Sequence, residues 1–293
     1  MTGGTVRELL LEAERFLDEH DVPESRASAE FLMASVLGVG RGALGIEQRA
    51  SLDERRRLQF WGLVRKRSRR LPMAYVLGTQ PFLGLQLDVT PDVLVPRPET
   101  EEMVEIAIGL AERMRPELGQ GVRAVDLGTG SGCIALALAS RIPDSFIVAT
   151  DSSRAALKVA EKNAAKLGLS TRVRFVEGDL FKPSPDVTAS WADLIVSNPP
   201  YIPSARIPKL DPEVLAEPHL ALDGGKDGLD AIRAIVSEAP SLLRPGGWLV
   251  LEMDDRQGAA VRALLEKRGF TDVEVRQDSG GRDRVAFGRL GGK

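Results

Sequence analysis

The sequence contains a single cysteine, Cys133, and only two histidines, His20 and His219, among 293 residues. One cysteine excludes an internal disulfide, and so small a set cannot form a Cys/His metal cluster, so we expect no metal. No run of about 18 apolar residues is present, and residues 1–8 lack the basic and then apolar pattern of a secretory signal. We therefore expect a cytoplasmic protein without a membrane span.

The sequence also lacks an excess of positive charge. Its formal net charge is −3 and its pI is near 5.7, unlike proteins that bind nucleic acid by covering a phosphate backbone. We expect a monomer with no stable nucleic-acid binding. The basic run at residues 65–70 is open to two interpretations, a solvated helix face or a contact for an acidic protein or ribosomal RNA.

The first region, residues 1–75, has apolar residues at helical spacing and predicts a small helical bundle domain. Asp21 with Glu24, and Ser51 with Glu54, have the spacing of capping boxes and predict the starts of two of its helices.

Two further regions follow. Residues 76–98 are rich in Gly and Pro with alternating apolar residues at 82–89 and 93–95, which predicts a β-hairpin linker. Residues 99–293 alternate strands with helices, which is typical of an α/β domain with a parallel sheet. Its seven expected strands are residues 122–127, 145–150, 172–177, 192–197, 247–252, 271–277 and 283–289. The last two are too close for a helix to join them, so we expect an antiparallel hairpin at the end of the sheet.

A glycine-rich loop follows the first of these strands, with the sequence Gly128-Thr129-Gly130-Ser131-Gly132. Glycines let the backbone turn sharply and let a ligand lie against bare amides at a helix N-terminus. The spacing differs from the dinucleotide and phosphate-loop motifs and favours a nucleoside ligand. Asp151 closes the next strand, where it can accept hydrogen bonds from ribose hydroxyls, cap the following helix, or do both. Asp179 and Leu180 either border an adenine ring or form a solvated turn.

Asn198, Pro199, Pro200 and Tyr201 directly follow the apolar strand at 192–197. The nitrogen of a planar NH2 group is a poor nucleophile because its lone pair is delocalised. A rigid turn with an Asn oxygen, a prolyl carbonyl and an aromatic face can hold both hydrogens of such a group and stack on its plane. The alternative is an ordinary proline-stiffened turn with a half-buried tyrosine.

These motifs resemble the class I S-adenosylmethionine-dependent methyltransferases and, more narrowly, the glutamine N5-methyltransferases of peptide-chain release factors. The resemblance also rests on Pro-Arg-Pro-Glu-Thr-Glu at 96–101 and on residues 218–230 and 281–284, and it spans essentially the whole chain. It implies a seven-stranded Rossmann-like sheet with a C-terminal antiparallel hairpin, preceded by a helical substrate-recognition domain. Residues 253–255 depart from the Gly-containing turn usual in the family.

The resemblance implies S-adenosyl-L-methionine as cofactor and, as acceptor, the Gln of the Gly-Gly-Gln motif in class 1 release factors. It carries catalytic roles onto Asn198, Pro199 and Tyr201 and substrate binding onto the same turn with Pro200. Cofactor contact is implied for Gly128, Thr129, Gly130, Ser131, Gly132, Asp151, Asp179, Leu180 and Asn198.

Residues outside these motifs have simpler interpretations. We expect His219 to fix its loop rather than act as a base, and Cys133 to be a small buried residue. Arg97 and Glu99 either help to close the cofactor pocket or form interdomain salt bridges.

Three other functions stay open at this point. A ribosomal-protein glutamine N5-methyltransferase shares the Asn-Pro-Pro-Tyr turn. An adenine N6-methyltransferase of nucleic acid also presents a planar NH2 group, but it must flip its base and grip phosphates, and this chain has no added basic domain. A non-catalytic nucleoside-binding scaffold would have no use for both the glycine loop and an intact Asn198 and Tyr201.

Overall fold

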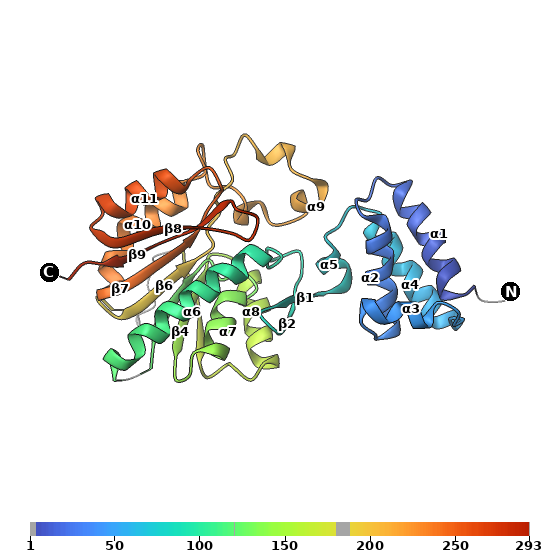
Figure 1. Ribbon diagram of the computed structural model, residues 1–293, viewed down its shortest axis with the longest axis horizontal. Helices are drawn as coiled ribbons and strands as arrows, with labels where there is room; N and C mark the ends of the chain where they lie inside the picture. The colour runs from blue at the N-terminus through green and yellow to red at the C-terminus, as the bar shows by residue number, and fades with distance from the viewer. Residues whose placement is uncertain (1–3, 120, 180–187, 293) are drawn as a thin grey trace. The chain divides into compact units, whose positions relative to one another are not determined.

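The computed structural model describes residues 4–119, 121–179 and 188–292 (Figure 1). The chain divides into two compact units. The first comprises Met1–Thr79 together with Asp211–Ala216, and the second comprises Gln80–Leu210 together with Glu217–Lys293. A short segment from late in the sequence therefore packs with the N-terminal unit.

The first unit is a bundle of helices, as the apolar spacing predicted. Its elements are α1 (Val6–Asp18), α2 (Ser25–Leu37), the 3-10 turn η1 (Arg41–Ala43), α3 (Leu44–Glu47), α4 (Glu54–Arg67), α5 (Met73–Leu77) and α9 (Pro212–Leu215). Leu17, Leu32, Met33 and Phe60 are fully buried in its core. Within the described ranges no single helix is long and apolar enough to cross a membrane; α2 and Arg41–Glu47, bent by 91°, meet that test only as a pair.

Both predicted capping boxes are wrong. The N-cap of α2, Glu24, has a left-handed φ of 50°, Asp21 has a φ of 53°, and no side chain caps this helix. The N-cap of α4 is Asp53 rather than Ser51, and its carboxylate accepts a hydrogen bond from the Arg56 amide at 2.7 Å. The capping residue therefore lies two positions beyond the predicted one.

The basic run at residues 65–70 is only partly a solvated face. Arg65, Lys66 and Arg69 are exposed, whereas Arg67 is buried and donates a hydrogen bond to Glu213 of α9 at 2.8 Å. Arg70 donates to both carboxylate oxygens of Glu213, at 2.7 and 2.8 Å. Burial would raise the pKa of Glu213, but the bonds from Arg70 and Arg67 outweigh it and lower that pKa to about 2.

The second unit is a seven-stranded sheet in the order β5-β4-β3-β6-β7-β9-β8. The strands are β3 (Arg123–Leu127), β4 (Phe146–Asp151), β5 (Val173–Glu177), β6 (Ala192–Ser197), β7 (Leu243–Glu252), β8 (Phe270–Gln277) and β9 (Asp283–Leu290). The first five pair in parallel, while β9 lies antiparallel to both β7 and β8, which confirms the predicted C-terminal hairpin.

Helices cover both faces of this sheet (Figure 1). The helices of this unit are α6 (Pro98–Leu118), α7 (Cys133–Arg141), α8 (Arg154–Lys166), α10 (Asp230–Leu242) and α11 (Gly258–Lys267), with 3-10 turns η2 (Ile207–Lys209) and η3 (His219–Ala221). The apolar residues of α6 and α7 share one buried cluster, and those of α10 and α11 share another. Burial on both faces explains why the central strands are almost continuously apolar.

The predicted linker contains a two-stranded sheet, but its strands differ from the prediction. They are β1 (Thr79–Phe82) and β2 (Leu85–Asp88), and residues 93–95 form no strand. Leu83 and Gly84 both have positive φ, 46° and 81°, and two such residues make the tight turn favoured in hairpins. The Leu83 amide also donates to Glu101 at 2.9 Å, which holds the turn in place.

Candidate active site

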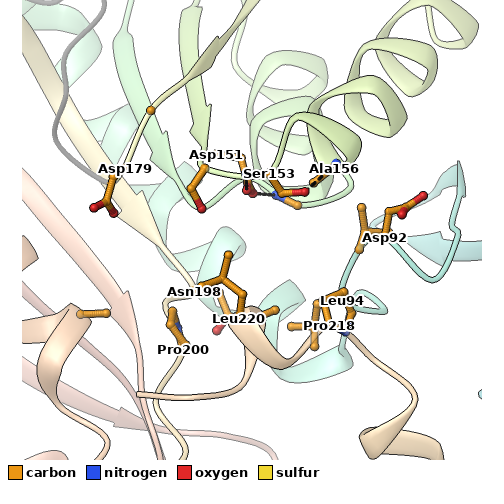
Figure 2. A pocket seen from close by; sticks show the side chains of 17 residues that line it. Asp92, Leu94, Asp151, Ser153, Ala156, Asp179, Asn198, Pro200, Pro218 and Leu220 are labelled. Carbon is orange, nitrogen blue, oxygen red and sulfur yellow. Dashed lines mark hydrogen bonds between the residues drawn. The ribbon is translucent and has the colours of Figure 1, made fainter. Parts of the chain in front are cut away.

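The carboxyl ends of β3, β4, β5 and β6 meet at a pocket of about 340 Å³ (Figure 2). Strand β3 lies between β4 and β6, so the order of the strands reverses here, where open α/β sheets bind their ligands. The lining residues are Asp92, Val93, Leu94, Gly128, Gly130, Asp151, Ser152, Ser153, Ala156, Gly178, Asp179, Asn198, Pro200, Pro218, Leu220, Ala221 and Ala231.

The glycine loop presents bare backbone to this pocket. Gly128 and Gly130 have φ values of 73° and 55°, and a Cβ added to either would meet no protein atom within 4 Å. Gly132 is the N-cap residue of α7, and a Cβ added to it would lie 3.1 Å from the Cβ of Ala160. The first two glycines thus leave room for a ligand, whereas the third permits close helix packing. Thr129 and Ser131, which the sequence also placed at the cofactor, have buried side chains and do not line the pocket.

Asp126 lies beneath the loop, and sequence reasoning did not single it out. Its Oδ2 accepts hydrogen bonds from the Thr129 hydroxyl at 2.6 Å and the Ala135 amide at 3.1 Å. Burial raises the pKa of Asp126 to about 7. Its Oδ1 has no partner among the described residues. The available signal was an acidic residue in an otherwise apolar strand.

Asp151 connects the glycine loop to the start of α8. Its two carboxylate oxygens accept hydrogen bonds from the Gly130 and Ser153 amides, each at 2.8 Å. The N-cap of α8 is Ser153, so the helix-capping interpretation of Asp151 is wrong. Burial raises the pKa of Asp151 more than these backbone bonds lower it. Asp179 lines the pocket beyond β5, while Leu180 lies outside the described residues.

The Asn-Pro-Pro-Tyr turn contributes two residues to the opposite wall, as Figure 2 shows for Asn198 and Pro200. Pro199 is buried, and the half-buried Tyr201 does not line the pocket. The Asn198 Nδ2 donates to the Thr100 hydroxyl at 3.0 Å. The structure therefore brings Asn198 together with the glycine loop and Asp151.

Tyr201 and Thr100 both donate hydrogen bonds to Glu252, which sequence reasoning missed. The Tyr201 hydroxyl lies 3.1 Å from Oε1 and the Thr100 hydroxyl 2.6 Å from Oε2. Burial raises the pKa of Glu252 to about 7, and burial together with Glu252 raises that of Tyr201. A carboxyl at the end of an apolar strand was the only local signal.

The remaining candidates lie outside the pocket lining. His219 is exposed in η3 beside Asp223, so its position does not favour a role as a base. Arg97 pairs with Glu217 within its own unit, and neither Arg97 nor Glu99 lines the pocket. Cys133 is buried at the start of α7, and burial raises the pKa of its thiol to about 12.

Comparison with known proteins identifies the family. Residues 8–78 match the PrmC N-terminal domain and residues 109–217 the methyltransferase small domain. The release factor glutamine methyltransferase from Geobacter sulfurreducens is 42% identical over 98% of this chain and 97% of its own length. The protein of the same name from Moorella thermoacetica is also 42% identical, over 96% of each chain. The protein of that name from Deinococcus radiodurans is 38% identical over 98% of this chain and 99% of its own. The chain belongs to the release factor glutamine methyltransferase family.

Solved structures show the same fold at lower identity. The catalytic domain of human METTL16 in complex with an RNA hairpin is 17% identical, with a TM-score of 0.56 over 83% of each chain. A methyltransferase from Pyrococcus furiosus is 21% identical, with a TM-score of 0.51 over 71% of this chain and 90% of its own. The family and the α/β methyltransferase fold predicted from the sequence are thereby confirmed.

Proposed function

We propose that the protein transfers a methyl group from S-adenosylmethionine to the side-chain nitrogen N5 of the glutamine in the Gly-Gly-Gln motif of class 1 release factors. The observation that carries this proposal is that Asn198 shares one pocket with Gly128, Gly130 and Asp151. A nucleoside-sized site thus lies directly beside a group suited to holding an amide. The relatives named for release factor glutamine methylation support the same acceptor.

The residues of the pocket fit the cofactor. At Gly128 and Gly130 the absence of a Cβ leaves space that a ligand can occupy. The pocket volume, near 340 Å³, is in the range of small-ligand sites. In this proposal Asp151 accepts hydrogen bonds from the ribose hydroxyls, and Asp179 borders the adenine. When bound, S-adenosylmethionine supplies a methyl group on a positively charged sulfur, which is electrophilic enough that no strong base is needed.

The acceptor amide is held by the Asn-Pro-Pro-Tyr turn. The Asn198 Oδ1 and the Pro199 carbonyl accept the two amide hydrogens, which draws the nitrogen toward tetrahedral geometry and localises its lone pair. Pro199 and Pro200 restrict the backbone so that the carbonyl keeps its direction. The ring of Tyr201 stacks on the amide plane. Positioning and exclusion of water provide most of the catalysis.

The helical unit recognises the protein partner in this proposal. Every residue that lines the cofactor pocket belongs to the second unit, which leaves the first unit free for another task. It carries a groove between α1 and α4, lined by Phe16, Leu58 and Trp61 among arginines and glutamates. Leu58 is 57% exposed and lies next to Phe16 and Trp61 in this groove, so the groove offers a partner more than a single apolar side chain.

A matched pair of surface changes tests this recognition role. We expect Leu58→Glu to raise KM for an intact release factor by roughly tenfold, because one central apolar contact often contributes more than 1 kcal/mol. Ile46→Glu changes a more exposed residue of the same unit outside the groove and serves as the control. Methylation of a short Gly-Gly-Gln peptide should be unaffected in both variants. Equal KM values for the release factor in the two variants would rule out this groove as the docking surface.

Label transfer tests the activity itself. Radiolabelled S-adenosylmethionine is incubated with the enzyme and a release factor, the same factor with its Gly-Gly-Gln glutamine changed to alanine, a ribosomal protein, or adenine-containing DNA. We expect label only on the unaltered release factor. Label on the altered factor or preferentially on DNA would overturn the glutamine proposal. The proposal also includes a monomeric enzyme in the cytoplasm. It includes no stable nucleic-acid binding, which the negative net charge favours.

A further inference from the structure

A buried carboxyl links the two ends of the Asn-Pro-Pro-Tyr turn. Glu252, the last residue of β7, is 1% exposed. It accepts one hydrogen bond from Tyr201 and another from Thr100, and Thr100 accepts one from Asn198. Neither Thr100 nor Glu252 lines the pocket, so any effect they have on the acceptor passes through the turn.

The chemistry of these groups gives the chain of hydrogen bonds a direction. An ionised carboxylate can only accept, and a hydroxyl has one hydrogen, so the Thr100 hydrogen points to Glu252. The Thr100 oxygen can then only accept from Asn198, and the NH2 end of the Asn198 amide supplies that hydrogen. The Oδ1 end of Asn198 is therefore left for the pocket, which this residue lines.

We propose that Glu252, acting through Thr100, is a positioning residue that keeps the carbonyl oxygen of the Asn198 side chain directed at the acceptor amide. The inference rests on the proposed function, in which that oxygen accepts a hydrogen from the substrate NH2 group. If the Asn198 amide were reversed, two NH2 groups would face each other and neither could accept. A wrong orientation therefore removes the contact entirely.

The direction holds only while Glu252 is ionised. A protonated Glu252 can donate to Thr100, whose own hydrogen can then turn toward Asn198, and both orientations of the amide become possible. The pKa of Glu252, raised to about 7 by burial, places this change near neutral pH.

Other charged and titratable groups surround Glu252. Arg284 on β9 lowers its pKa and Glu99 on α6 raises it. Tyr201 and Cys133 face it as neutral groups, because burial raises the pKa of each. Neither of these two neutral groups changes its charge near pH 7.

Thr100 offers a matched pair of variants for kinetics with the full-length enzyme. Thr100→Val keeps the shape and removes the hydroxyl, whereas Thr100→Ser keeps the hydroxyl. We expect kcat for a release factor to fall by roughly tenfold or more in the valine variant and to stay near the wild-type value in the serine variant. The calorimetric affinity for S-adenosylmethionine should change less than about twofold in both. Equal kcat values in the two variants would overturn the inference, whereas absence of label transfer by the wild type would refute only the proposed function.

Nuclear magnetic resonance tests the network without substrate or cofactor. The enzyme is labelled with ¹⁵N at asparagine and ¹³C at glutamate, and the Asn198 side-chain signal is identified by its loss in Asn198→Ala. We expect this signal and the Glu252 carboxyl carbon to shift with the same midpoint as pH is varied. The Asn198 shift should disappear in Glu252→Gln and Thr100→Val and persist in Thr100→Ser. An Asn198 signal that stays constant while Glu252 titrates would refute the positioning role.

Discussion

A buried carboxyl lies behind each of the two walls of the pocket, but the two carboxyls accept hydrogen bonds from different groups. On the glycine-loop wall, Asp126 accepts from the Thr129 hydroxyl and from a backbone amide of α7. On the opposite wall, Glu252 accepts from the hydroxyls of Thr100 and Tyr201. Both carboxyls thus receive a hydrogen bond from a hydroxyl that can rotate. The walls differ in what that hydroxyl contacts next: Thr100 accepts a hydrogen bond from Asn198, which lines the pocket, so a change in the protonation of Glu252 can reach the pocket lining.

This difference suits the task proposed for each wall. The glycine-loop wall receives a cofactor through backbone shape and the Asp151 carboxylate, neither of which has to choose between two orientations. The other wall must present an oxygen rather than an NH2 group at Asn198. Four pairs of variants can break or sharpen this comparison.

The largest effect is expected at Asn198. Asn198→Ala should lower kcat by roughly 10²- to 10³-fold, because it removes a preorganised acceptor that acts on the transition state. If Asn198 also contacts the cofactor, the loss of that contact would raise KM for S-adenosylmethionine as well. Asp92→Ala, which alters an exposed residue of the same pocket, should leave kcat within about threefold. Single-turnover methylation of a release factor measures both, and similar values for the two variants would remove Asn198 from the catalytic role.

A change on the glycine-loop wall should affect binding instead. Asp151→Ala removes the proposed ribose contacts and the bonds to Gly130 and Ser153, and it should weaken binding of S-adenosylmethionine by roughly 2 to 4 kcal/mol. Asp179→Ala, at an exposed turn, should cost less. Calorimetry on both variants gives the comparison. An unchanged affinity in Asp151→Ala would show that this carboxylate does not hold the cofactor.

Local motifs explain how much of the site could be predicted. The glycine loop, Asp151 and Asn198 each follow directly after a strand, so their positions came with the strand pattern. Thr100 and Glu252 could not be found this way, because they are 98 and 54 residues from Asn198 (198 − 100 and 252 − 198) and only the folded sheet joins them. No local pattern records a contact of that kind.

The fold shows the same limit. Most strand boundaries followed from apolar runs. Strand β7 is an exception: it begins at Leu243 rather than at residue 247, because Leu243 pairs with Ala192 across a register shift. The intervening Pro-Gly-Gly sequence is typical of a turn, so the sequence did not predict this extension. Helix α1 begins at a true capping box, Thr5 with Glu8, which sequence reasoning passed over. Spacing alone also matched two false boxes, because the decisive factor is the backbone conformation of the cap residue.

The buried carboxyls predict a pH dependence of stability that both walls share. Asp126 and Glu252 have pKa values near 7, above their unfolded values, so the folded protein binds these protons more tightly. The free energy of unfolding should therefore fall as pH rises from about 4 to about 7, by roughly 3 to 4 kcal/mol at most for each group.

Isosteric amides separate the two carboxyls. Asp126→Asn and Glu252→Gln should each flatten the pH dependence of urea unfolding measured between pH 5 and 8. Only Glu252→Gln should also remove the fall in kcat below pH 7, because in this proposal only Glu252 sets the orientation of the Asn198 amide, through Thr100. A loss of that kinetic pH dependence in Asp126→Asn would show that the two walls do not differ in this respect.

The smallest effect on stability is expected at the glycines, where two changes share one cost and differ in another. Gly130→Ala and Gly168→Ala both place a side chain at positive φ, 55° and 70°, and neither added Cβ meets a protein atom within 4 Å. Each should lower the free energy of unfolding by about 1 kcal/mol. Only Gly130 lines the pocket, so only Gly130→Ala should also weaken binding of S-adenosylmethionine. Equal calorimetric affinities in the two variants would mean that the cofactor does not lie against this backbone. The glycines of this loop would then be required only for the backbone conformation of the turn.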